Sequence, residues 1–160
     1  MKNGPLLRSF VLFCCVLAAC KKSSHGPAVP VTPASNISVS ANDSLLHYTI
    51  NLAYIQDVDS AHTTLISGEY ADTSSKKGSL AIRLPGDTTG RFTGGNLHIT
   101  YTDGKGNLYY NTADTTNYVQ LDKYPKEYNG VLSGSFSFLA TGTAGSVKFS
   151  NGSIIAIFQK

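Results

Sequence analysis

Apolar side chains recur at every second position in several short segments of this chain, and this period limits what it can fold into. The clearest case is Leu46, Tyr48, Ile50, Leu52 and Tyr54, which alternate with polar or small residues. Successive side chains of a β-strand point to opposite faces, so the pattern predicts a half-buried strand. No segment of ten or more residues carries a helical pattern of apolar positions. We therefore expect an all-β fold.

Further strands are expected at residues 63–70, 80–84, 97–101, 108–110, 132–138, 147–149 and 154–158. The turn residues 103–107 predict a hairpin, and Asn151-Gly152 is the strongest two-residue hairpin signal in the chain. Short strands at such regular spacing are typical of an antiparallel β-sandwich or a small β-barrel, here of about seven to nine strands. The sequence does not separate these two architectures.

The N-terminus reads as a targeting segment. Lys2 and Arg8 precede ten uncharged residues at positions 10–19, FVLFCCVLAA. This run has about half of the roughly 20 apolar residues that a helix needs to cross a bilayer. A removable signal peptide is expected in preference to a permanent membrane span.

The end of that run, Leu17-Ala18-Ala19-Cys20, resembles the lipobox of bacterial lipoproteins. The resemblance implies cleavage before Cys20 and a lipid on its thiol, so that Cys20 holds the mature chain on a membrane. Residues 1–19 would be the signal peptide, 20–35 the lipidated cysteine with a flexible Ser- and Pro-rich tether, and 36–160 a single all-β domain. The alternative is an ordinary cleaved signal in which Cys20 is incidental.

Two further features bear on that resemblance. Lys21 and Lys22 follow the cysteine, where some bacteria place acidic sorting residues. The resemblance thus implies an outer-membrane anchor facing the periplasm, with the cell surface as the alternative. In addition, the segments GSFSF from Gly134 and VKFSNGS from Val147 resemble the ending of small bacterial lipoproteins with all-β domains.

Charge and cysteine content narrow the functions of the domain. From Asn36 onward there are nine Lys and Arg residues against ten Asp and Glu, a net charge of −1. Nucleic-acid binding lacks the basic surface that it needs. All three cysteines lie at or before position 20, so no disulfide or cysteine metal site is expected in the domain.

Tyrosine is concentrated in one region and gives the main functional hint. Six of the nine tyrosines lie between positions 101 and 128. Aromatic side chains with a polar tip suit contact with a glycan or a protein. The candidate recognition surface consists of Tyr109, Tyr110, Tyr118, Tyr124 and Tyr128. Residues 111–130 are expected to be the longest loop, and the absence of Trp argues against a typical sugar-binding module.

Catalytic and metal-binding patterns are weak. His47, His62 and His98 have no zinc-type spacing, and no GxSxG turn is present to activate a serine. Asp57-Val58-Asp59 and the segment 103–107 match only fragments of calcium loops. We predict no catalytic residue, metal or cofactor.

Three functions stay open on this sequence. The first is a membrane-anchored, non-catalytic binding module that contacts an envelope protein or glycan through the tyrosine-rich region. The second is a β-barrel that binds a small apolar molecule in its interior. The third is an envelope hydrolase, in which one of the three histidines would meet a serine or carboxylate in a cleft.

Overall fold

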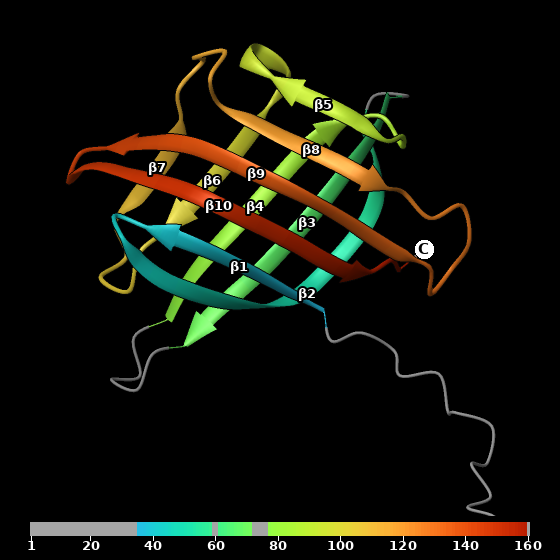
Figure 1. Cartoon of the computed structure of the whole chain (residues 1–160), viewed down its shortest axis with the longest axis horizontal. Coiled ribbons are helices and arrows are strands. Elements are labelled where there is room, and N and C mark those ends of the chain that lie inside the picture. The colour runs from blue at the N-terminus through green and yellow to red at the C-terminus, as the bar shows by residue number, and fades with distance from the viewer. Residues whose placement is uncertain (1–34, 59–60, 72–76, 160) are drawn as a thin grey trace, which may run out of the picture. The chain divides into compact units, whose positions relative to one another are not determined.

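The computed structural model describes residues 35–58, 61–71 and 77–159 (Figure 1). The predicted signal peptide, Cys20 and residues 21–34 of the predicted tether lie outside these ranges. The described part contains ten strands and one short 3₁₀ helix. They are β1 (Asn36–Ala41), β2 (Ser44–Val58), β3 (Ala61–Ala71), β4 (Lys77–Pro85), β5 (Gly90–Thr93), η1 (Gly94–Asn96), β6 (His98–Thr102), β7 (Leu108–Asn111), β8 (Tyr118–Lys123), β9 (Val131–Gly142) and β10 (Gly145–Ile157).

Eight of these strands close into an antiparallel barrel (Figure 1). The ring runs β1, β2, β3, β4, β6, β7, β9 and β10, and β10 returns to pair with β1. Closure pairs both edges of every strand in the ring over much of its length, which removes the exposed edges of an open sheet. The all-β expectation is confirmed, and of its two architectures the barrel is the one observed.

Strands β5 and β8 lie outside the ring. β8 pairs with β9 at residues 133–137, beyond the stretch of β9 that pairs with β7, and β5 pairs with β8. The predicted loop of residues 111–130 is wrong, because β8 lies within it, and no predicted strand corresponds to β1 or β5. Val119 and Leu121 of β8 are fully buried. Strands β1, β5 and β8 have at most six residues each. The alternation of apolar and polar residues along them is therefore too short to be recognised in the sequence.

In most predicted strands, the alternating apolar side chains point into the core as expected. On β4 the side chains of Leu80, Ile82 and Leu84 are fully buried, while those of Ala81 and Arg83 face outward. On β2 a bulge between Ile50 and Leu52 interrupts the pairing with β3. The extra residue shifts the alternation by one position. Tyr48 and Ile50 are buried before the bulge, and the odd-numbered Ala53 is buried after it. The single alternation predicted from Leu46 to Tyr54 therefore ends at this bulge.

Asn151-Gly152 does not form the predicted hairpin. It lies within β10, where the pairing with β9 shifts between Phe149 and Gly152. The hairpin between β9 and β10 turns at residues 143–144 instead, where Gly142 and Gly145 are partners. Asn151 has a φ of 54°. The same tolerance of positive φ that suits Asn for a tight turn also suits it for a bulge inside a strand.

The interior of the barrel holds one continuous hydrophobic core. The rings of Phe138 and Phe149 stack at 4.4 Å between centroids, and Tyr101 meets Phe149 edge-on at 5.0 Å. Burial of a large apolar side chain contributes about 1.5–3 kcal/mol. Because no cysteine follows Cys20, this packing carries the stability that disulfides supply in many small secreted domains.

Gly152 provides a direct test of the bulge and of the packing beneath it. A Cβ at this position would lie 2.5 Å from the ring of Phe136, itself fully buried. We expect Gly152→Ala to lower the free energy of unfolding by about 1–3 kcal/mol, the usual cost of overpacking a core. Urea unfolding followed by circular dichroism measures this change.

Gly95→Ala is the matched control. A Cβ at Gly95 meets no atom within 4 Å, so this variant should unfold at nearly the same urea concentration as the wild type. Equal stability of the two variants would contradict the assignment of Gly152 to a packed bulge.

Candidate functional site

The five tyrosines of the predicted recognition surface lie in different environments. Tyr109 is buried in the barrel, whereas the adjacent Tyr110 is 54% exposed on the outer face of β7. The Tyr118 ring lies beneath the guanidinium carbon of Arg91, at 3.9 Å from the ring centroid. Tyr124 is half-buried, and Tyr128 is 61% exposed. They do not form one continuous surface, and their role in recognition stays a prediction.

Several tyrosines face the interior. Tyr48 and Tyr101 lie on the apolar strand faces that the alternation predicts, whereas Tyr109 belongs to the predicted recognition surface and is buried as well. Tyr109 packs against Tyr101 at 5.4 Å between centroids, and Tyr48 packs against Tyr70 at 5.6 Å. The hydroxyl of Tyr48 is buried and makes no hydrogen bond with any described residue. Burial, followed by the neighbouring Tyr101, raises the pKa of Tyr48 well above its ordinary value. These side chains belong to the core at one end of the barrel.

Asp103 organises the turn between β6 and β7. Its Oδ1 accepts hydrogen bonds from the backbone N–H groups of Lys105 (2.8 Å) and Asn107 (2.9 Å). Its Oδ2 accepts from the Asn107 side chain (2.8 Å) and from the Tyr109 hydroxyl (3.3 Å). Partial burial would raise the pKa of Asp103, but these hydrogen bonds together hold it below its usual value. The carboxylate of this calcium-like fragment therefore stabilises a turn.

The histidines are distributed over separate strands. The His47 Nδ1 and the Ser38 hydroxyl are 2.8 Å apart on β2 and β1, while His98 lies opposite Arg83 on β6. β3, which carries His62, and β4 separate β2 from β6. Among the described residues no group of three or more His, Cys, Asp or Glu is placed to hold a metal ion. Of the other calcium-like fragment, Asp59 lies outside the described residues.

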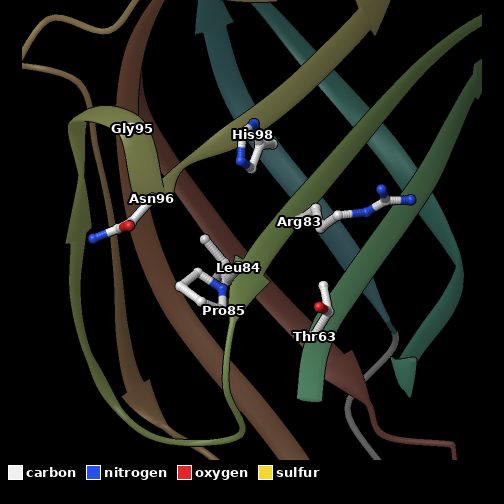
Figure 2. Close-up of a pocket in the computed structure, with 7 residues that line it drawn as sticks. All are labelled: Thr63, Arg83, Leu84, Pro85, Gly95, Asn96 and His98. Carbon is white, nitrogen blue, oxygen red and sulfur yellow. The ribbon is translucent and has the colours of Figure 1, made fainter. Parts of the chain in front are cut away.

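A pocket of about 370 Å³ opens beside the end of β4 (Figure 2). It forms because β6 pairs with β4 only as far as Arg83, so that Leu84 and Pro85 face η1 instead. In Figure 2 the Arg83 side chain extends away from Asn96 and Pro85. His98 lines this pocket together with Thr63, but no serine, cysteine or carboxylate does. Among the described residues no hydrogen bond joins the Thr63 hydroxyl to His98, so the pocket does not show the paired nucleophile and base that hydrolysis requires.

Exposed apolar side chains gather on the outer face of β7 and β9. Leu108 is 47%, Tyr110 54% and Leu139 38% exposed. Leu108 and Tyr110 are two residues apart on β7, and Tyr110 pairs with Thr141, which is two residues from Leu139 on β9. These three side chains thus share one face, which we call the β7–β9 patch. They make up three of the five large apolar side chains that are well exposed in the described part.

A second pocket, of about 460 Å³, brings together segments far apart in the sequence. Asp87 and Thr88 come from the loop after β4, Tyr124 and Tyr128 from the loop after β8, and Phe158 follows β10. We call it the Tyr124 pocket. The sequence analysis singled out the two tyrosines, but nothing in the local sequence indicates that Asp87 and Phe158 lie beside them.

Comparison with protein-family models, with curated proteins and with solved structures found no match to this chain. Within the described residues no helix is long and apolar enough to cross a membrane.

The lowered pKa of Asp103 predicts a loss of stability in acid. Above the ordinary Asp pKa of about 3.9, the ionised carboxylate makes its full contribution to the free energy of unfolding. This contribution disappears as the pH falls through the lower pKa of Asp103 in the folded state. Asp103→Asn should cost about 1 kcal/mol near neutral pH, because two donors lose their acceptor at Oδ2. Urea unfolding of both proteins should show the difference shrinking between about pH 4 and pH 2. A difference that is unchanged over this range would refute the role of the charge.

Proposed function

We propose that this protein is an outer-membrane lipoprotein, held by lipid on Cys20 and facing the periplasm, whose barrel docks onto another envelope protein. Docking is assigned to the β7–β9 patch, and the module has no catalytic role. The observation that carries the proposal is the exposure of Leu108, Tyr110 and Leu139 on one face of the barrel.

The anchor is supported by the sequence of residues 1–22 and by where the barrel begins. The Ser35 carbonyl accepts a hydrogen bond from the Ile50 N–H, and the Ser35 hydroxyl accepts one from the Ile157 N–H at 2.9 Å. Ser35 is thus tied to the barrel, and fourteen residues separate it from Cys20. At about 3.3–3.6 Å for each extended residue, they span at most about 50 Å. Such a tether allows the barrel to meet partners close to the membrane.

The patch has the chemistry of a protein contact. Tyrosine and other large apolar side chains are common in the buried centre of interfaces, where charged residues are depleted. β7 and β9 are paired to each other, and β7 is also paired to β6. The backbone of such a sheet loses little further freedom on binding, which favours affinity. Leaving them in water without a partner has no structural benefit.

The two other functions have weaker support. Large side chains such as Tyr48, Phe136 and Phe149 are fully buried inside the barrel, where an apolar ligand would have to be accommodated. The hydrolase requires a histidine beside a serine or a carboxylate in a cleft, and the pocket beside His98 has neither in its lining.

Substitution of the anchor cysteine tests the membrane assignment. We expect the wild type from its native host to begin at Cys20 and to carry the mass of its acyl chains, whereas Cys20→Ala should keep an uncut N-terminus without lipid. Buried acyl chains contribute roughly 0.8 kcal/mol for each methylene, so the wild type should be found in the membrane fraction. Fractionation with mass spectrometry of the N-terminus measures both effects. An intact Met1 and an unmodified Cys20 thiol in the wild type would rule out the lipid anchor.

Variants of the β7–β9 patch test docking separately. Crosslinking in intact envelopes should join the wild type to a specific protein, and Leu108→Ser with Tyr110→Ser should reduce that product about tenfold or more. Leu45→Ser is the matched control, because Leu45 is 64% exposed on β2, outside the patch. Both variants must retain the wild-type circular dichroism spectrum. An equal yield of the same product from all three proteins would exclude the patch as the docking surface.

A further inference from the structure

The loop that forms one side of the Tyr124 pocket is held rigidly. The Asn129 N–H donates to the Phe158 carbonyl at 3.0 Å, and the Phe158 N–H donates to the Gly130 carbonyl at 2.9 Å. A Cβ on Gly130 would lie 2.3 Å from the Cβ of Pro125, so the loop folds back on itself without space to spare. The pocket is thus preorganised, which reduces the entropy lost when a ligand binds.

The Tyr124 ring has a fixed orientation. Its hydroxyl lies 3.0 Å from the Thr64 hydroxyl, which donates its one hydrogen to the Gly86 carbonyl at 2.7 Å. Tyr124 must therefore be the donor to Thr64. Its ring also packs against Phe158 at 5.5 Å between centroids. Burial raises the pKa of Tyr124, the Thr64 bond lowers it by less, and the nearby Asp87 carboxylate raises it again. The hydroxyl stays protonated, and the ring is held in place beside Asp87.

The remaining lining combines an exposed aromatic ring with charged side chains. Tyr128 is 61% exposed. Asp87 and Glu127 both line the pocket, and carboxylate oxygens accept hydrogen bonds. Lys126 also lines the pocket. The volume of about 460 Å³ falls within the range of about 300–1,000 Å³ that is usual for small-ligand sites.

This lining discriminates among ligand classes. Two carboxylates repel an anion, and Lys126 leaves a net charge of only −1 to attract a simple cation. A neutral sugar satisfies all of the groups, because its C–H face packs on a tyrosine ring while its hydroxyls donate to Asp87 and Glu127. We propose that the Tyr124 pocket binds a neutral sugar unit of a glycan. This site is distinct from the β7–β9 patch and does not depend on the lipid anchor.

Titration of the full chain with soluble oligosaccharides tests the site. The protein is purified in a detergent without a sugar headgroup and titrated by calorimetry with tetrasaccharides of glucose, mannose and N-acetylglucosamine. At least one should bind with a dissociation constant of about 1 mM or tighter. Tyr128→Ala should weaken that binding about tenfold or more through loss of the stacking surface, and Asp87→Asn about threefold or more.

Tyr110→Ala is the matched control, because Tyr110 is similarly exposed but belongs to the β7–β9 patch. It should leave the sugar affinity unchanged, and all variants should keep the circular dichroism spectrum of the wild type. Three results would overturn the proposal: no binding of any tetrasaccharide, binding that Tyr128→Ala does not weaken, or a higher affinity for tetramethylammonium than for every sugar. Because the titration needs neither a membrane nor a partner protein, failure here leaves the docking proposal standing.

Discussion

The pairing of β1 with both β2 and β10 is the interaction on which the barrel depends. This six-residue strand joins the start of the described chain to its end, and without it two long strands would become free edges. Ile37 and Val39 of β1 are completely buried, so the strand also completes the core. Since no cysteine is available after Cys20, hydrogen bonding around the ring and packing within it must together keep the edges from aggregating.

Closure divides the side chains into two populations with different roles. Tyr109 and Tyr110 are neighbours in sequence, yet one packs against Tyr101 inside while the other lies in solvent on the β7–β9 patch. The alternation of a strand thus separates groups that serve stability from groups that are free to bind. A rigid wall of this kind can present binding groups on several faces, as we propose for the β7–β9 patch and the Tyr124 pocket.

The sequence predicted the fold class well because alternation is a local signal. Leu80, Ile82 and Leu84 behave as their pattern indicates, and the turn at Asp103 joins two strands as predicted. Bulges were not predictable, since Asn151-Gly152 has the same local preference whether it ends a strand or bends one. The choice of barrel over sandwich depends on β1 meeting β10, a contact between the two ends of the described chain.

The candidate sites depend still more on long-range contacts. The clustering of tyrosines drew attention to residues 101–128, but alternation placed Tyr109 in the core. Tyr124 and its hydrogen-bond partner Thr64 are 60 residues apart. Asp87 comes to the same pocket from a third segment. Composition can indicate that a region is suited to binding, whereas the partners of each side chain follow only from the strand order.

Hydroxyl-radical footprinting with mass spectrometry would test the central claim, that the outer face of β7 and β9 is covered by a partner in the envelope. The purified protein and the protein in isolated envelopes are labelled in parallel, with the exposed Leu45 as the internal reference. Leu108, Tyr110 and Leu139 should label readily in the purified protein and be protected in envelopes, while Leu45 labels equally in both. Equal labelling of the three patch residues in the two samples would contradict the account.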